Sequence, residues 1–355
     1  TINATGTNLT YQWQRSFNGI SWTTLVNDAT YSAVTTNTLV VASNPTLDAS
    51  QYRCVVSGAC TSPQTSNPGI LTVNSPLQIV TQPNVETLCP GGSVVLSVTA
   101  TGLALTYQWQ VNTGSGWNNV VNGGVYSNAG TRQLSLTNVP LSFNQNQYRC
   151  VVNGTCSPTT ISSPSILTVN TPLAISVQPV AATTICSGTN TSFSVGASGT
   201  GPYTYQWYLS TGSGFNPISN GGVYSGATSG TLNITGITAA PSTQTFFYFC
   251  AVGGACGGAA SGQAVLTVNA LPVITSSPSN STVCSGNNAS FSITATGTGL
   301  TYQWQRSFNG INWVNLSNDA IYSAVTTNTL VVTTNPTVDA SQYRCVVSGA
   351  CTSPQ

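Results

Sequence analysis

Cysteine is the residue type in this sequence with the most scope for chemistry. The 355 residues include eleven cysteines, six arginines, four aspartates and one glutamate, but no lysine, histidine or methionine. A Ser-His-Asp or Cys-His arrangement therefore cannot be built, and the sequence predicts no catalytic residue and no enzyme. Cysteines without histidine and without zinc-type CxxC pairs indicate disulfide chemistry in an oxidising compartment.

The scarcity of charge excludes several other kinds of site. Charged residues make up 3% of the chain, the net charge is +1, and residues 171–269 contain no acidic residue. A calcium ion needs six to eight oxygen ligands, usually including several carboxylates, so we predict no metal and no cofactor. Nucleic acid is not expected as a partner because its affinity depends on many phosphate contacts by lysine and arginine. No apolar run approaches the roughly 20 residues that span a bilayer, so this segment should not insert into a membrane.

The tripeptide YQW marks an internal repeat. Its tryptophans are 96, 98 and 97 residues apart, and the segment Thr10–Ile20 returns almost unchanged at Thr301–Ile311. Successive repeats end in LTVN and are joined by two or three residues that include proline, which leaves limited hinge freedom. We therefore predict four repeats of about 97 residues, the first without its opening strands and the last without its closing strand, at residues 1–74, 75–170, 171–269 and 270–355.

Short segments in each repeat alternate apolar and polar residues. Val94, Leu96 and Val98 share one face of an expected strand, and Tyr148 and Cys150 share one face of a later strand. Such alternation between Gly, Asn, Pro and Ser clusters is typical of an all-β sandwich. Each repeat should have one core centred on its tryptophan, and the predicted core residues are Trp13, Trp109, Trp207, Trp304, Tyr52, Tyr148, Tyr248 and Tyr343.

The order of tryptophan followed by Tyr-x-Cys resembles the immunoglobulin family. The sequence DASQYRC at Asp48–Cys54 and Asp339–Cys345 is similar to the acidic turn, tyrosine corner and second core cysteine of that family. The resemblance covers all four repeats and implies tandem immunoglobulin-like sandwiches placed end to end. Val98, Val195 and Ile293 stand where the family has its first cysteine, so the usual inter-sheet disulfide is not expected.

A closer resemblance is to tandem domains of giant surface proteins secreted by gliding bacteria of the Bacteroidetes type. The second repeat has their pattern of Cys89-x-Gly91, YQWQ at 107–110, QYRCVV-x-G-x-C at 147–156 and a final LTV. This resemblance implies an extracellular, cell-surface adhesin or filament protein that is exported by a dedicated outer-membrane route. The third repeat departs from the pattern, with Tyr248-Phe249-Cys250 in place of Tyr-Arg-Cys.

The cysteines of each complete repeat allow three kinds of pairing. The resemblance to two-cysteine repeats implies a bond between the first and third cysteine, which leaves the middle one as a buried thiol. Alternatively, the middle and third cysteines could pair across a hairpin at Asn153-Gly154, or spare cysteines could cross-link neighbouring repeats or chains. The candidates for the first pairing are Cys89, Cys156, Cys186, Cys256, Cys284 and Cys351, and the expected buried or alternatively paired thiols are Cys54, Cys150, Cys250 and Cys345.

A second aromatic residue follows each core tryptophan by eight or nine positions, in a Gly- and Asn-rich region. These residues either cover the edge of the core, which we favour, or form a platform that binds sugars. They are Trp22, Trp117, Phe215 and Trp313.

The repetition and the low charge together favour a structural role. Copying a folded unit lengthens a rod without new chemistry, and lateral association costs little when few charges repel one another. We expect a surface fibre, filament or adhesin stalk that associates with itself or with neighbouring repeats. The alternative is an adhesive module that binds a glycan or a cell-surface protein through the hairpin aromatics.

Overall fold

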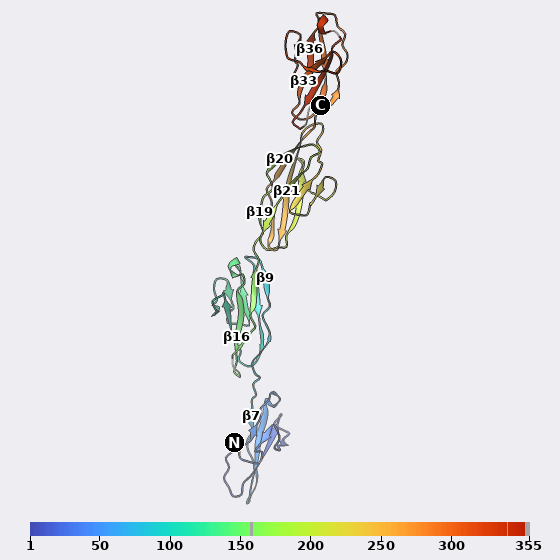
Figure 1. The fold of residues 1–355 in the computed structure, drawn as a ribbon. Coiled ribbons are helices and arrows are strands. Elements are labelled where there is room, and N and C mark those ends of the chain that lie inside the picture. The colour runs from blue at the N-terminus through green and yellow to red at the C-terminus, as the bar shows by residue number, and fades with distance from the viewer. Residues whose placement is uncertain (157–158, 339, 352–355) are drawn as a thin grey trace. The chain divides into compact units, whose positions relative to one another are not determined.

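The computed structural model describes residues 1–156, 159–338 and 340–351. The chain divides into two compact units, Thr1–Val169 and Asn170–Gln355. The first unit covers the predicted ranges 1–74 and 75–170 except for Asn170, and the second unit covers the ranges 171–269 and 270–355. We call these ranges repeats one to four. Figure 1 shows the strands of each repeat in chain order, from blue to red. Asp339, which belongs to the motif shared with Asp48, and residues 352–355 at the end of repeat four lie outside the described residues.

The secondary structure consists of strands and three short 3-10 helices throughout the described ranges. Repeat one contains β1 (Thr10–Ser16), β2 (Thr23–Thr24), β3 (Tyr31–Ser32), β4 (Val40–Val41), η1 (Pro45–Leu47), β5 (Ser50–Gly58), β6 (Thr61–Thr65) and β7 (Gly69–Leu71). Repeat two contains β8 (Gln78–Thr81), β9 (Glu86–Leu88), β10 (Val94–Ser97), β11 (Thr99–Thr101), β12 (Thr106–Asn112), β13 (Trp117–Asn119), β14 (Tyr126–Ser127), β15 (Gln133–Leu136), η2 (Leu141–Phe143), β16 (Gln147–Asn153), β17 (Thr160–Ile161) and β18 (Ser165–Val169).

The second unit contains repeats three and four. Repeat three contains β19 (Ala174–Val177), β20 (Ala182–Cys186), β21 (Thr191–Ser194), β22 (Gly196–Ser198), β23 (Thr204–Ser210), β24 (Asn216–Pro217), β25 (Tyr224–Ser225), β26 (Thr231–Ile234), β27 (Gln244–Gly254), β28 (Gly257–Ala260) and β29 (Ala264–Asn269). Repeat four contains β30 (Val273–Ser276), β31 (Asn288–Ser292), β32 (Thr294–Thr296), β33 (Thr301–Ser307), β34 (Val314–Asn315), β35 (Tyr322–Ser323), β36 (Thr329–Thr333), η3 (Pro336–Val338) and β37 (Gln342–Ser348). No helix in the described part of the chain has the length and apolarity needed to cross a bilayer.

Repeats two and three share one sheet topology. In repeat two the larger sheet has the order β13-β12-β16-β18-β9, and the facing strands form β10-β15-β14 and β11-β8. The closing strand β18 runs antiparallel to β16 and parallel to β9. In repeat three, β29 likewise lies between β27 and β20. The strand near the start of a repeat is thus tied to the strand that ends it.

Each repeat has its own hydrophobic cluster between its two layers. In repeat two, Tyr148, Cys150 and Val152 of β16 are fully buried, while the residues between them are partly exposed. Trp109 pairs with Cys150 in register and is also fully buried. The alternation in the sequence therefore marks the inward face of the strand, as expected for a half-buried sheet.

The glutamine of YQW and the indole of its tryptophan both bond to nearby backbone. Gln108 donates from Nε2 to the carbonyl oxygens of Trp109 and Val120, at 2.8 and 2.9 Å. Trp109 donates from Nε1 to the carbonyl oxygen of Thr131 at 3.0 Å. Repeats one, three and four make the same bonds from their own Gln and Trp, because buried polar groups need partners.

Candidate functional site at the repeat junction and the outer sheet face

A disulfide joins repeat three to repeat four. It links Cys186, the last residue of β20, to Cys351, which follows β37, with a Cα–Cα distance of 5.4 Å. The two cysteines are separated by 165 residues in the sequence. The bond therefore connects the first cysteine of one repeat to the third cysteine of the next.

The implied pairing of the first and third cysteine within one repeat is wrong for this pair, and the fold explains why. Cys186 lies opposite Asn269, at the end of the closing strand β29. Cys256, the third cysteine of repeat three, has its Sγ 3.9 Å from the carbonyl oxygen of Asn170, where the repeat begins. A disulfide requires Cα atoms about 4.4–6.8 Å apart, and residues at opposite ends of one sandwich cannot meet that requirement.

The remaining cysteines also depart from the expected pairings. Cys156 and Cys284 carry free thiols, so neither forms a bond with the first or third cysteine of its own repeat. Cys150 is free as well, and the alternative hairpin bond between Cys150 and Cys156 is therefore absent. Cys89 and Cys256 are disulfide-bonded. The third alternative, a cross-link between neighbouring repeats, describes Cys186–Cys351, although the cysteines that form it are not the spare middle ones.

Hydrogen bonds surround this disulfide at the join between the two repeats. The N–H of Ala270 donates to Thr298 Oγ1 at 2.9 Å, and the N–H of Thr298 donates to the carbonyl oxygen of Ala270 at 3.2 Å. The hydroxyls of Thr243, in repeat three, and Thr298, in repeat four, are 2.8 Å apart. The N–H of Ala350, next to the disulfide, donates to the carbonyl oxygen of Thr298 at 2.9 Å. Thr298 therefore connects the linker, repeat three and the loop that carries Cys351.

Two glycines allow this join to pack closely. A Cβ on Gly297, whose φ is +142°, would lie 2.9 Å from the carbonyl oxygen of Leu271 and from Pro272 Cα. A Cβ on Gly349 would lie 2.7 Å from Pro272 Cγ. Only glycine fits such spaces without displacing the backbone. The short linker and its neighbours thus form a packed junction with little room for a hinge.

The middle cysteines are buried thiols within the cores. Cys54, Cys150 and Cys250 are fully buried, Cys345 is 8% exposed, and all four are free. Burial raises the pKa of Cys150 to about 12 and the pKa of Cys250 and Cys345 to about 11, and it raises the pKa of Cys54 as well. Val98 is buried in the same cluster as Cys150, and free cysteine packs there as a small apolar residue.

The thiols should therefore differ sharply in reactivity. At pH 8 the buried thiols are neutral and shielded, so iodoacetamide should modify only Cys60, Cys156 and Cys284 in the folded chain. In denaturant without a reductant, seven thiols should react, and all eleven should react after reduction. Mass spectrometry counts the added groups. Modification of more than seven cysteines before reduction would contradict the disulfides described above.

On the outer face of the larger sheet, an arginine stacks on the second aromatic residue. In repeat two, the guanidinium carbon of Arg149 lies 4.1 Å from the ring centroid of Trp117. Arg149 Nε donates to Gln110 Oε1 at 2.9 Å, and Gln110 Nε2 donates to Asn119 Oδ1 at 2.9 Å. These four side chains come from β12, β13 and β16, which hold them in one row by their register.

Repeats one and four carry the same arrangement. The guanidinium of Arg53 lies 4.0 Å from the ring of Trp22, and that of Arg344 lies 4.3 Å from the ring of Trp313. These indoles, like Trp117, are half-buried and do not belong to the hydrophobic clusters. They lie on the outer sheet face and not at the core edge, where we expected them. Arginine covers one face of each indole.

Repeat three has aromatic rings at three of the four positions of this row. Tyr208 stands in place of the glutamine, Phe249 in place of the arginine and Phe215 in place of the tryptophan. The rings of Tyr208 and Phe249 are parallel, with centroids 4.9 Å apart, and Phe215 packs edge-on against Phe249 at 4.8 Å. The departure at Tyr248-Phe249-Cys250 is thus one part of a concerted change. It gives this repeat an uncharged aromatic surface.

Removing the stacking arginine should uncover the indole beneath it. We expect Arg149→Ala to lower the free energy of unfolding of repeat two by about 0.5–1 kcal/mol. It should also increase the quenching of Trp117 fluorescence by acrylamide. Arg132→Ala is the matched control, since it removes an exposed arginine of the same repeat that lies away from this row. Equal quenching in the two variants would show that the Arg149–Trp117 stack does not persist in solution.

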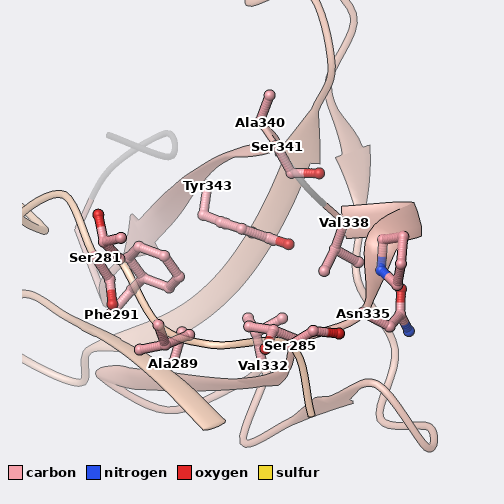
Figure 2. Close-up of a pocket in the computed structure, with 14 residues that line it drawn as sticks. Ser281, Ser285, Ala289, Phe291, Val332, Asn335, Val338, Ala340, Ser341 and Tyr343 are labelled. Carbon is pink, nitrogen blue, oxygen red and sulfur yellow. The ribbon is translucent and has the colours of Figure 1, made fainter. Parts of the chain in front are cut away.

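Repeat four has an open flank beside its core. A cavity of about 530 Å³ is lined by Phe291, Val332, Val338 and Tyr343, among others, and Figure 2 shows these side chains around it. In repeat three the equivalent tyrosine, Tyr248, is fully buried and its strand pairs with β29. Among the described residues of repeat four, β37 pairs only with β33. Repeat one has a similar opening, of about 560 Å³, beside Trp13 and Tyr52.

Three aspartates, Asp28 and Asp48 of repeat one and Asp319 of repeat four, bind the backbone of their own repeats. Asp28 accepts from the N–H groups of Thr30 and Tyr31 at 2.7 Å, and Asp319 makes the equivalent contacts. Asp48 accepts from the N–H of Val73 at 2.8 Å and so holds the chain that follows β7. In the described ranges, no group of three or more His, Cys, Asp or Glu side chains is arranged to hold a metal ion.

Comparison with known proteins identifies the fold. The titin I-band fragment I67–I69 superposes with a TM-score of 0.60 at 17% identity and covers 78% of this chain and 95% of its own length. An E-to-A variant of the same three-domain fragment gives a TM-score of 0.59 at 17% identity, with coverages of 78% and 94%. This chain is a tandem array of immunoglobulin-like domains. Sidekick-1 immunoglobulin domains 1–5 match at 19% identity with a TM-score of 0.43 and cover 96% of this chain and 71% of their own length.

Sequence comparisons match a smaller part of the chain. A family model described as a domain of unknown function, DUF8696, matches residues 273–355, which form most of the fourth immunoglobulin-like domain. No curated protein matches the chain. Because one fold serves many functions, the role of this array must be argued from its own junctions and surfaces.

Proposed function

We propose that this chain is a structural, extracellular repeat protein that forms the fibre, filament or stalk part of a cell-surface adhesin. The observation that carries the proposal is the junction between repeats three and four, where a disulfide, hydrogen bonds and a three-residue linker all act at one place. An array that only displayed separate modules would not need such a join. A stalk does need one, because it must resist bending between its units.

The composition supports the same proposal. Disulfides persist in oxidising surroundings, which agrees with a location outside the cytosol. Charged residues make up 3% of the chain, so electrostatic repulsion between chains packed side by side is small. The proposed partners are therefore neighbouring repeats and further copies of the chain. The resemblance to Bacteroidetes-type surface adhesins adds the proposal that the filament is displayed on the cell surface.

Electron microscopy of the purified chain and of native material tests this proposal. The longest strand, β27, has 11 residues, and at about 3.3 Å per residue it spans about 36 Å. We expect filaments or rods with an axial spacing of roughly 35–45 Å per domain. Dispersed single chains at every concentration and salt condition would count against a fibre.

A second candidate function is adhesion through the outer sheet face. The aromatic surface of repeat three favours it, because Phe215 is 40% exposed and carries no arginine cover. Stacked rings of this kind suit the apolar faces of sugars or an apolar patch on a protein. A glycan array and a pull-down with the whole chain test this candidate, using Phe215→Ala and Trp117→Ala. Specific binding that these variants lose would favour adhesion, and unchanged binding would locate it elsewhere.

A further inference from the structure

We propose that the open flank of repeat four is a binding site for a peptide that adds to this repeat as a β-strand. The peptide that fits is uncharged and extended, with a small residue, a leucine and a valine at alternate positions. Such a site goes beyond a structural role for the array, because it gives one repeat a binding partner. A single chain would have it whether or not chains assemble into filaments.

The equivalent position in repeats two and three is filled by the closing strand. In repeat three, β29 pairs antiparallel with β27 and parallel with β20, the latter from Ala182 to Cys186. In repeat two, β18 pairs in the same two directions with β16 and β9. The two strands beside this position therefore hold a third strand through the backbone, which is how a sheet accepts an added peptide.

Repeat four has both neighbours of this position. Strand β37 corresponds to β27, and residues 281–284 correspond to the last four residues of β20. In the described part of repeat four, β37 pairs with β33 alone, and residues 281–284 belong to no strand. A peptide between them would therefore meet two sheet edges that lack the strand found in the other repeats.

The cavity of the open flank lies between these two edges, because residues of both edges line it. Val283 lines it from one edge and Tyr343 from the other, and Phe291 also contributes, as Figure 2 shows for the two aromatic rings. Tyr343 and Phe291 are half-buried, whereas their equivalents in repeat three, Tyr248 and Phe193, are at most 1% exposed. An added strand would remove the exposed surface of both rings from water, which favours binding.

The closing strands of repeats two and three define the chemistry of the peptide. Ala264, Leu266 and Val268 of β29 are fully buried, and Leu167 and Val169 of β18 are 1% exposed. The described residues that line the cavity are all uncharged, so a charge on that face of the peptide would lose its hydration without gaining a partner. Because β18 and β29 are buried in their own repeats and β7 is paired with β5, the peptide has to come from outside the folded repeats.

The register of β29 gives a direct test on the whole chain. Asn269 lies opposite Cys186, so the last residue of an added strand should lie opposite Cys284, the equivalent cysteine, whose thiol is free and exposed. The probe is a synthetic peptide of residues 263–269 with Asn269→Cys, its sulfur carried as a pyridyl disulfide. The Cys284 thiolate attacks the peptide sulfur, a new disulfide forms, and pyridine-2-thiolate leaves and takes up the proton that Cys284 released. Mass spectrometry should find Cys284 labelled at least about tenfold faster than Cys60 and Cys156, since binding holds the two sulfurs together.

Two control peptides separate strand addition from simple thiol reactivity. A peptide that also carries Leu266→Asn should lose the preference for Cys284, because it lacks the side chain that fills the cavity. A peptide with its cysteine at the other end, at Gln263→Cys, should also show no preference, since a parallel strand places that sulfur roughly 20 Å away. Equal labelling of Cys60 and Cys284 by the first peptide overturns the proposal, as does equal labelling of Cys284 by all three peptides.

Light scattering identifies the occupant. The parent chain should remain monomeric at the concentration used for labelling. Dimers that the first peptide dissociates would show that a second copy fills the flank, which would overturn a partner from outside the folded repeats. Absence of filaments in the microscope would leave the labelling result unaffected.

Discussion

Trp207→Ala is expected to lower the unfolding temperature of repeat three by at least about 12 °C and to leave the transition of repeat two unchanged. The Trp207 side chain is fully buried at the centre of its cluster, and Nε1 donates to the carbonyl oxygen of Ser229 at 2.9 Å. Truncating such a tryptophan costs about 3–5 kcal/mol, and each kcal/mol shifts the midpoint of a domain this size by about 4–8 °C. Calorimetry of the whole chain measures the change.

The matched control for this substitution is Phe215→Ala in the same repeat. Phe215 is 40% exposed and contacts Phe249 on the outer sheet face, so its loss should cost no more than about 1.5 kcal/mol. If the two variants unfold at the same temperature, Trp207 does not centre the core of repeat three. A uniform shift of every transition would instead show that the repeats unfold as one body.

Loss of the Cys186–Cys351 disulfide is expected to lower the free energy of unfolding of repeats three and four together by about 5 kcal/mol. The reason is the chain entropy of the unfolded state, since an intact bond across 165 residues confines a large loop. Urea denaturation of Cys186→Ser/Cys351→Ser should show a lower midpoint for these repeats and an unchanged midpoint for repeat one. Cys284→Ser should match the parent chain, because its thiol is free.

Chemical reduction gives an independent check on how much the Cys186–Cys351 disulfide stabilises repeats three and four. A phosphine reductant should lower the urea midpoint of the parent chain at least to that of the double serine variant. Its effect on repeats three and four should be smaller in the variant, where the bond of Cys256 is still reduced but the Cys186–Cys351 bond is already gone. A parent midpoint that does not move on reduction would show that the disulfide does not form in solution or does not stabilise the folded state.

The sequence alone was sufficient to predict the repeated sandwich and the residues that fill it. Tyr148 and Cys150 alternate with polar residues along one strand, and the period of that alternation fixes which side chains face inward. The recurrence of YQW fixes how often the pattern restarts. Both properties are local, because each depends only on residues a few positions apart or on copies of the same short segment. No relation between distant parts of the fold was needed.

The arrangement of side chains on the outer sheet face could be determined only from the tertiary structure. Arg149 and Trp117 are far apart in the sequence, and they meet only because β16 and β13 both flank β12 in a particular register. The joint replacement by Tyr208, Phe215 and Phe249 in repeat three offers a signal in the sequence. This signal can be recognised only when the structure shows that the three positions are neighbours.

The partners of the cysteines were also decided by the tertiary structure. Their number and spacing predicted disulfide chemistry but implied a bond within each repeat. In the structure the first and third cysteines of repeat three lie at opposite ends of the sandwich, near Asn269 and Asn170. Cys186 therefore pairs with Cys351 of the following repeat. A disulfide depends on a distance of a few ångströms between two Cα atoms, and only the packing of whole repeats sets that distance.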